Sequence, residues 1–149
     1  MSPAEVILLV NAATTWFMCG VIWFVQLVHY PLFRDYDRGR FTAVMLAHQR
    51  RTAVVVFPAM AAGLVTSLLL VAFSPPGIPG WMPWIGAVSA TVWGVSTARI
   101  QVPLHEKLAA LGFSPAVHTR LVTTNWVRAA AWSVQGLVCV GMLSLKSAN

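Results

Sequence analysis

The sequence predicts an all-α membrane protein, a bundle of four antiparallel transmembrane helices that extends beyond the bilayer on the cytoplasmic side. The chain of 149 residues is 58% hydrophobic and 9% charged, whereas about a quarter of the residues of a soluble domain are charged. The apolar residues fall into four long runs, and the basic residues gather at one side of those runs. This length suits one domain, so we expect residues 1–149 to form a single integral membrane domain.

The first two helices are expected over about residues 4–30 and 41–73. The apolar run that begins at Val6 is long enough to cross a bilayer, which takes about 20 residues. Pro31 should end the first helix, because a proline disfavours the helical conformation of the residue before it. The second helix is longer than the hydrocarbon layer requires, so its first two turns should protrude, and Pro58 should kink it.

The last two helices are expected over about residues 82–111 and 114–145. A loop rich in proline and glycine, residues 74–80, precedes the third helix, and Pro103 should kink that helix near its end. Gly112 should end it. Ser114 and Pro115 then supply the cap and the first position of the fourth helix.

The distribution of positive charge predicts the orientation. Lys146 lies at one side of the predicted membrane, and the other nine cations lie at the opposite side: Arg34, Arg38, Arg40, Arg50, Arg51, Arg99, Lys107, Arg120 and Arg128. The positive-inside rule makes the crowded side cytoplasmic, with both termini outside, in a bacterial-type inner membrane. These cations flank apolar runs and form no face of their own, so the net charge of +6 does not indicate binding to nucleic acid.

All four histidines lie in the predicted cytoplasmic half, one on each helix: His29, His48, His105 and His118. Bundle cores commonly hold metal ions, and a set rich in histidine and poor in carboxylate favours copper or iron, with zinc next. Glu106 would be a further ligand or a general base. Two alternatives stay open. Two of the histidines could instead hold a haem whose propionates pair with arginines, or the histidines could simply contact headgroups and water.

The last helix carries a polar stripe into the membrane. His118, Leu121, Asn125, Arg128, Trp132 and Gln135 fall on one face at 3.6 residues per turn. Such a stripe should face protein or water rather than lipid. Arg128 either extends to the interface or pairs with Glu106 or an anionic ligand. Further candidates for contact with a substrate are Gln26, Gln101, Arg51 and Trp126.

Two segments resemble a known family. Val102-Pro103-Leu104-His105-Glu106-Lys107-Leu108-Ala109 and Thr124-Asn125-Trp126-Val127-Arg128 are similar to the second half of the anthrone-oxygenase-like family of small four-helix membrane proteins. The similarity covers mainly residues 95–135 and touches Pro103, Asn125 and Arg128 directly. His105 stands where the family is expected to have an amide residue. The resemblance implies an oxygenase or oxidoreductase that acts on a hydrophobic, often polycyclic aromatic, compound.

Taken together, these features predict a metal-dependent membrane oxidoreductase, an oxygenase in the first instance. The four histidines would bind the metal ion. Glu106, Asn125 and Arg128 would be the catalytic residues, and a hydrophobic small molecule would enter from the lipid bilayer. The rival prediction is a small transporter or a membrane scaffold whose polar layer is a hydrated cavity.

Overall fold

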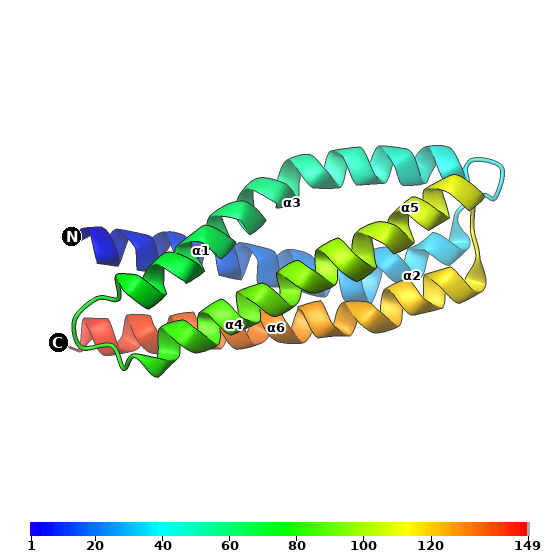
Figure 1. The fold of residues 1–149 in the computed structure, drawn as a ribbon. Coiled ribbons are helices and arrows are strands. Elements are labelled where there is room, and N and C mark those ends of the chain that lie inside the picture. The colour runs from blue at the N-terminus through cyan, green and yellow to red at the C-terminus, as the bar shows by residue number, and fades with distance from the viewer. Residues whose placement is uncertain (149) are drawn as a thin grey trace.

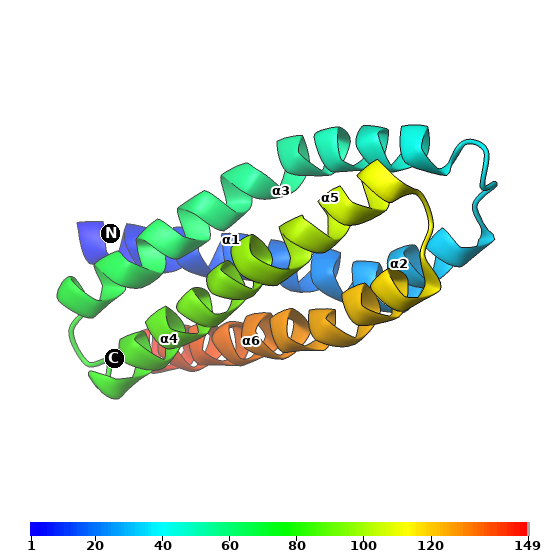
Figure 2. The ribbon, with the colours of Figure 1, turned by 45° about the vertical axis from the view of Figure 1, so that its right-hand side comes forward.

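The computed structural model describes residues 1–148, which are almost entirely helical and contain no β-strand. Four helical rods lie lengthwise beside one another (Figure 1 and Figure 2). The second and fourth rods are single helices, α3 (Phe41–Ala72) and α6 (Pro115–Ser147). The first rod is composed of α1 (Pro3–Phe24), η1 (Val25–His29), α2 (Tyr30–Leu32) and η2 (Phe33–Asp35). The third rod is composed of α4 (Trp81–Ser96), η3 (Thr97–Gln101) and α5 (Val102–Leu111).

Three of the rods are long and apolar enough to cross a membrane: Pro3–Asp35, Phe41–Ala72 and Pro115–Ser147. The sequence predicted four such helices. The third rod, residues 81–111, is long enough, but its glycine, serine, threonine and tryptophan residues lower its mean hydropathy. The class of protein is therefore a helical membrane protein with three clear membrane-crossing candidates in the described part of the chain.

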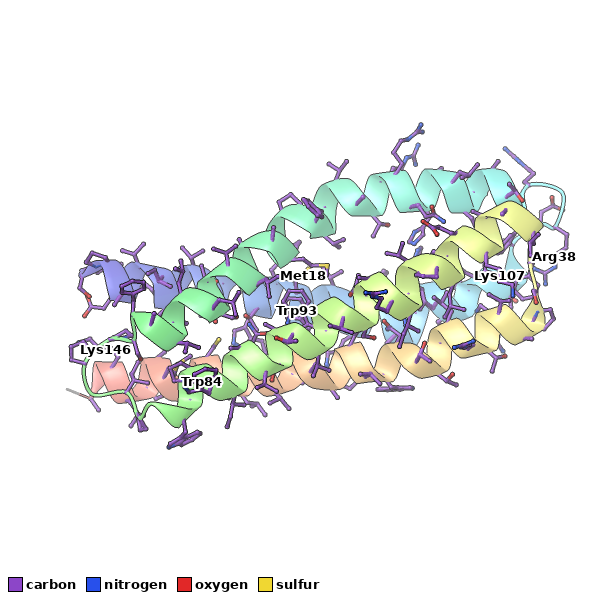
Figure 3. The ribbon with its side chains drawn as sticks, viewed as in Figure 1. Met18, Arg38, Trp84, Trp93, Lys107 and Lys146 are labelled. Atoms are coloured by element: carbon purple, nitrogen blue, oxygen red, sulfur yellow. The ribbon has the colours of Figure 1, made fainter. Side chains whose placement is uncertain are left out.

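The two ends of the molecule differ in charge. The N- and C-termini lie at the same end (Figure 1). Figure 3 shows Trp84 and Lys146 toward this end, and Arg38 and Lys107 at the opposite end. The loops between the first and second rods and between the third and fourth rods lie at the end that carries Arg38 (Figure 1).

The prediction that Pro31 ends the first helix is wrong. The rod continues to Asp35, and a π-helical turn, η1, precedes the proline. The Tyr30 N–H donates to the Val25 carbonyl across this wide turn. Pro31 then lies in the first turn of the next α-helical segment, where a backbone N–H is not needed.

The same device occurs in the third rod. The Val102 N–H donates to the Thr97 carbonyl across η3, and Pro103 follows directly. The kink predicted near Pro103 is therefore a π-helical turn just before it. π-Helical turns inside α-helices are rare and are found frequently at functional sites.

The core is closed from the middle of the bundle, where Figure 3 shows Trp93 beside Met18, toward the termini. Trp93 and Trp132 stack with ring centroids 4.1 Å apart, and both side chains are buried. The Gln135 side chain accepts a hydrogen bond from Trp93 Nε1 at 2.7 Å and donates to Thr15 and Ser67. Buried polar groups are costly in an apolar environment unless they are paired. This network therefore ties the first, second and third rods to α6.

Toward the opposite end, α3 bends in its middle, where Pro58 lies in the helix (Figure 2). The side chains before the bend are poorly covered: Val54, Val55 and Phe57 are exposed. Two cavities lie beneath this half of α3.

Candidate functional site

The first cavity has a volume of about 280 Å³ and lies between the N-terminal half of α3 and the other three rods. One part of its lining is apolar: Met18, Val21, Ile22, Val25, Val56 and Met60. Another part is polar: Tyr30, His48, Gln49, Gln101, His105 and Arg128. A mostly apolar pocket with a few converging polar groups is typical of a site for a small molecule.

Three of the four histidines gather beside this cavity. His29 Nε2 lies 3.0 Å from His48 Nδ1, and the rings of His48 and His105 are 5.3 Å apart between centroids. The buried ring of Phe33 packs against all three imidazoles. Helices from the first three rods thus bring one imidazole each to one level of the bundle.

His118 is held apart from the other three. Its side chain is buried, and its Nε2 lies 2.8 Å from the Tyr30 backbone carbonyl. A carbonyl oxygen only accepts hydrogen bonds, so His118 Nε2 must carry the proton. The ring packs between Phe33 and Phe113. His118 therefore acts as a tie between α6 and the end of the first rod.

The arrangement does not form a complete metal site. Within residues 1–148, no group of three or more histidine, cysteine, aspartate or glutamate side chains is arranged so that it could hold a metal ion. His29 and His48 are within hydrogen-bond distance of each other, and His105 is within hydrogen-bond distance of the Tyr30 hydroxyl group. The predicted set of four ligands is thus divided between a pair, a third imidazole with its own partner, and His118.

The contact that dominates the polar end of the cavity was not predicted from the sequence. The Tyr30 hydroxyl lies 2.8 Å from His105 Nε2, and the Tyr30 side chain is buried. A helix that stopped at Pro31 would have left this tyrosine at a frayed end in the membrane interface. No sequence signal was available unless the helix was expected to continue beyond the proline.

Arg128 is buried and oriented by a chain of amides. Its Nη1 donates to Asn125 Oδ1 at 3.1 Å, and Asn125 Nδ2 donates to Gln26 Oε1 at 2.8 Å. Gln26 Nε2 in turn donates to the Val122 carbonyl at 3.2 Å. The guanidinium therefore lines the cavity instead of extending to the membrane interface.

The remaining predicted residues fall into two groups. Gln101 is buried in the cavity wall, where its Nε2 donates to Thr124 at 2.9 Å, and Glu106 lies at the cavity edge with an exposed side chain. Trp126 is not in the cavity. It is 45% exposed and packs edge-on against Trp23 on the outer surface. Arg51 is also outside and lines the second cavity.

The second cavity is an open groove of about 550 Å³ between the first rod and α3. His29 and Arg51 lie in its lining, and His48 and Thr52 line both cavities. The Thr52 hydroxyl lies 3.1 Å from His48 Nδ1, the same nitrogen that faces His29. His48 therefore stands in the wall between the open groove and the inner cavity.

No family model, no curated protein and no solved structure matches this chain. The resemblance to the anthrone-oxygenase-like family therefore stays a prediction from the two sequence segments.

Proposed function

We propose that the protein is a membrane-embedded oxidoreductase, in the first instance an oxygenase, that acts on a hydrophobic ring compound. The observation that carries this proposal is the Tyr30–His105 pair in the wall of a largely apolar cavity. A hydroxyl group and an imidazole in hydrogen-bond contact can exchange protons with a bound carbonyl or hydroxyl group. The apolar lining favours a substrate that arrives from the lipid phase.

The pair suits proton removal from an acidic carbon beside an aryl carbonyl. When His105 Nε2 donates to the Tyr30 oxygen, its Nδ1 is a free base and the Tyr30 hydroxyl proton is available to the substrate carbonyl. The base takes the proton, and the electron pair of the broken C–H bond delocalises onto the carbonyl oxygen. Glu106, exposed at the cavity edge, would then pass the proton to solvent.

Dioxygen is the electron acceptor in this proposal. A C–O bond forms between the carbanion and dioxygen, which is thereby reduced to the level of a peroxide. Loss of water from the hydroperoxide leaves a new carbonyl group. A methylene group has then become a carbonyl, one oxygen atom has entered the product, and the other has left as water with both hydrogens.

We further propose that the rods form an antiparallel four-helix membrane bundle, with the third rod as the fourth span. The arginine-rich end would protrude into the cytoplasm of a bacterium, and both termini would lie outside its inner membrane. Support comes from the three apolar rods and from the placement of both termini (Figure 1) opposite the end that carries Arg38 and Lys107 (Figure 3).

A metal-dependent form of the reaction is a second candidate, favoured by one distance. His29 Nε2 and His48 Nδ1 are 3.0 Å apart, and two nitrogens bound to one ion at about 2.0–2.1 Å and near a right angle lie roughly 2.9 Å apart. His105 would become a third ligand only after its ring had left Tyr30. A copper or iron ion there would supply redox chemistry. Haem is less favoured, because its two axial rings need a slot between them, whereas His29 and His48 bind each other.

The sealed half of the molecule favours an enzyme over a transporter. Transport would need the cavity to open toward both ends of the bundle. The stacked Trp93 and Trp132 rings and the Gln135 network fill the bundle toward the termini. Opening the cavity in that direction would break several buried contacts.

The first experiment measures oxygen uptake by purified full-length protein in lipid nanodiscs, with anthrone as the probe substrate and isotopically labelled dioxygen. We expect His105→Ala to lower the turnover number by about 100-fold or more, because a general base typically contributes 10²–10⁴-fold. Tyr30→Phe should lower it less. Trp126→Phe, which lies outside the cavity, should leave it unchanged.

Equal turnover by His105→Ala and the unaltered protein would contradict the proposed acid–base pair. Metal analysis of the same samples separates the two forms of the reaction. A stoichiometric metal ion that is lost in both His29→Ala and His48→Ala favours the metal-dependent form, and turnover in metal-free protein favours the form that uses Tyr30 and His105 alone.

A further inference from the structure

We infer that the inner cavity binds a hydrophobic ring compound that carries one negative charge, a carboxylate or an ionised acidic hydroxyl group, with its anionic oxygen at Arg128. This inference rests on the proposed function in one respect, namely that the same cavity is the substrate site. It adds the charge and the chemical class of the ligand.

Arg128 is a buried charge without a counter-ion. Its side chain is 7% exposed, and its neighbours Asn125, Tyr30 and His105 carry no negative charge. In the part of the chain that the structure describes, the one ion pair joins Lys146 to Glu5, and Figure 3 shows Lys146 toward the end of the molecule that carries the termini. A guanidinium does not lose its proton at ordinary pH, and a buried charge is costly unless it is paired. Glu106 lies at the edge of the same cavity, but within residues 1–148 it forms no ion pair with Arg128, so we expect a ligand to supply the counter-ion.

Unpaired polar atoms mark the same place. Seven buried side-chain nitrogen or oxygen atoms among residues 1–148 have no hydrogen-bond partner, and four of them belong to residues that line the inner cavity. These four are Arg128 Nε, Gln49 Nε2, Gln101 Oε1 and His105 Nδ1. Buried polar groups nearly always have partners in native proteins. Their concentration at one cavity indicates a ligand with several polar atoms at one end.

The donor set defines that polar end. Arg128 Nε and Gln49 Nε2 are donors, so they suit anionic oxygens, and Gln101 Oε1 is an acceptor, so it suits a hydroxyl group. Asn125 orients the guanidinium from behind without neutralising it. An aromatic hydroxy acid or a polyhydroxylated ring compound would satisfy these atoms together.

The other end of the ligand must be apolar and compact. Met18, Ile22, Val56 and Met60 line the cavity away from the polar groups, and methionine adapts to flat rings. A volume of about 280 Å³ lies near the lower limit of roughly 300–1,000 Å³ for small-molecule pockets. Two or three fused rings are therefore a better fit than a long acyl chain.

The test compares three fluorescent probes with nearly the same shape: anthracene carboxylate, anthracene methanol and aminomethyl anthracene. Binding to full-length protein is measured in phosphatidylcholine nanodiscs. We expect the carboxylate to bind about ten-fold or more tightly than the alcohol, because hydrogen bonds to a charged group are worth more than neutral ones. The ammonium probe should bind most weakly.

Two variants assign the preference to one side chain. Arg128→Gln should abolish the discrimination between carboxylate and alcohol, and Arg128→Lys should retain part of it. Arg120→Gln removes an exposed arginine from the same helix and should leave the discrimination unchanged. The comparison of probes on unaltered protein needs no variant, so a variant that fails to fold does not remove the test.

Equal binding of carboxylate and alcohol to the unaltered protein would overturn the inference while leaving a pocket for hydrophobic compounds intact. Failure of every probe to bind would count against the proposed function as well. A further outcome is that the carboxylate probe binds in phosphatidylcholine nanodiscs and loses its binding when the protein is placed in phosphatidylglycerol nanodiscs. That result would assign the anion to a lipid headgroup and overturn the assignment to a small ring compound.

Discussion

Asn125 shows how a single residue can direct a buried charge without cancelling it. Its side chain is fully buried, accepts from Arg128 and donates to Gln26. A carboxylate at the same position would have neutralised the charge of the guanidinium. The amide instead fixes the orientation of Arg128 and leaves its charge available to a ligand.

Asn125→Asp is therefore the sharpest single-residue variant, because it changes the charge of this side chain at almost constant shape. We predict that it removes the preference for anthracene carboxylate over anthracene methanol, by about ten-fold or more, while the affinity for the alcohol stays within about two-fold. Fluorescence titration of both probes measures the two affinities. A variant that still prefers the carboxylate would show that Arg128 is not the residue that recognises the anion.

Residue counting on the last helix predicted part of the site. A period of 3.6 residues placed His118, Asn125, Arg128 and Gln135 on one inward face, and all four side chains are buried. Trp126 was wrongly placed at the site, because it is adjacent to Asn125 and therefore about 100° away around the helix. The counting could not show that His118 would bind the Tyr30 carbonyl, because that contact depends on where the first rod ends.

At the scale of elements, the two π-helical turns decide which side chains meet. Each wide turn holds one extra residue and rotates the segment that follows relative to a regular helix. Gln26 and His29 are three residues apart, and both lie within η1, where Gln26 contacts α6 and His29 lines the outer groove. After the turns, Tyr30 and His105 point toward each other.

Replacing Pro103 by alanine tests this device. An alanine restores a backbone N–H that can bond within a regular helix, so we predict that η3 shortens to α-helical geometry and that His105 rotates away from Tyr30. Thermal unfolding should show equal or slightly greater stability, since a proline in the first turn of a helical segment costs little. Affinity for the anthracene probes should fall by about ten-fold, because the displaced His105 ring no longer completes the polar end of the cavity.

Pro83→Ala, near the start of α4 at the opposite end of the bundle, is the matched control and should leave probe binding unchanged. Retention of full binding by Pro103→Ala, with the helix shown to be regular, would mean that the π-helical turn does not position the site.

Helix boundaries were largely predictable because they depend on local chemistry. Gly112 ends α5 with a φ of 79°, a left-handed conformation that favours glycine. Pro115 lies in the first turn of α6, as expected. Pro31 misled the prediction, because a π-helical turn before a proline allows the rod to continue, and no simple sequence rule signals such a turn.

At the scale of the whole molecule, the bundle is divided into a sealed half and a hollow half. The sealed half contains a satisfied network around Asn11, whose Nδ2 donates to Thr66 and Ser67 at 2.9 Å. In the hollow half, α3 is bent (Figure 2), and residues of its N-terminal half line both cavities. Composition predicted a helical membrane protein. The cavities depend on how the bend at Pro58 and the packing of α3 combine, and the periodicity of a single helix does not predict that packing.

The measurement that tests the account most directly is photoaffinity labelling of the full-length protein in nanodiscs with an anthracene carboxylate that carries a diazirine group, followed by mass spectrometry. The account predicts adducts on Met18, Val56 and Met60, from the first rod and from α3, that disappear with excess unlabelled anthracene carboxylate. Adducts confined to the exposed Trp84 and Trp126, or adducts that excess ligand does not suppress, would contradict it.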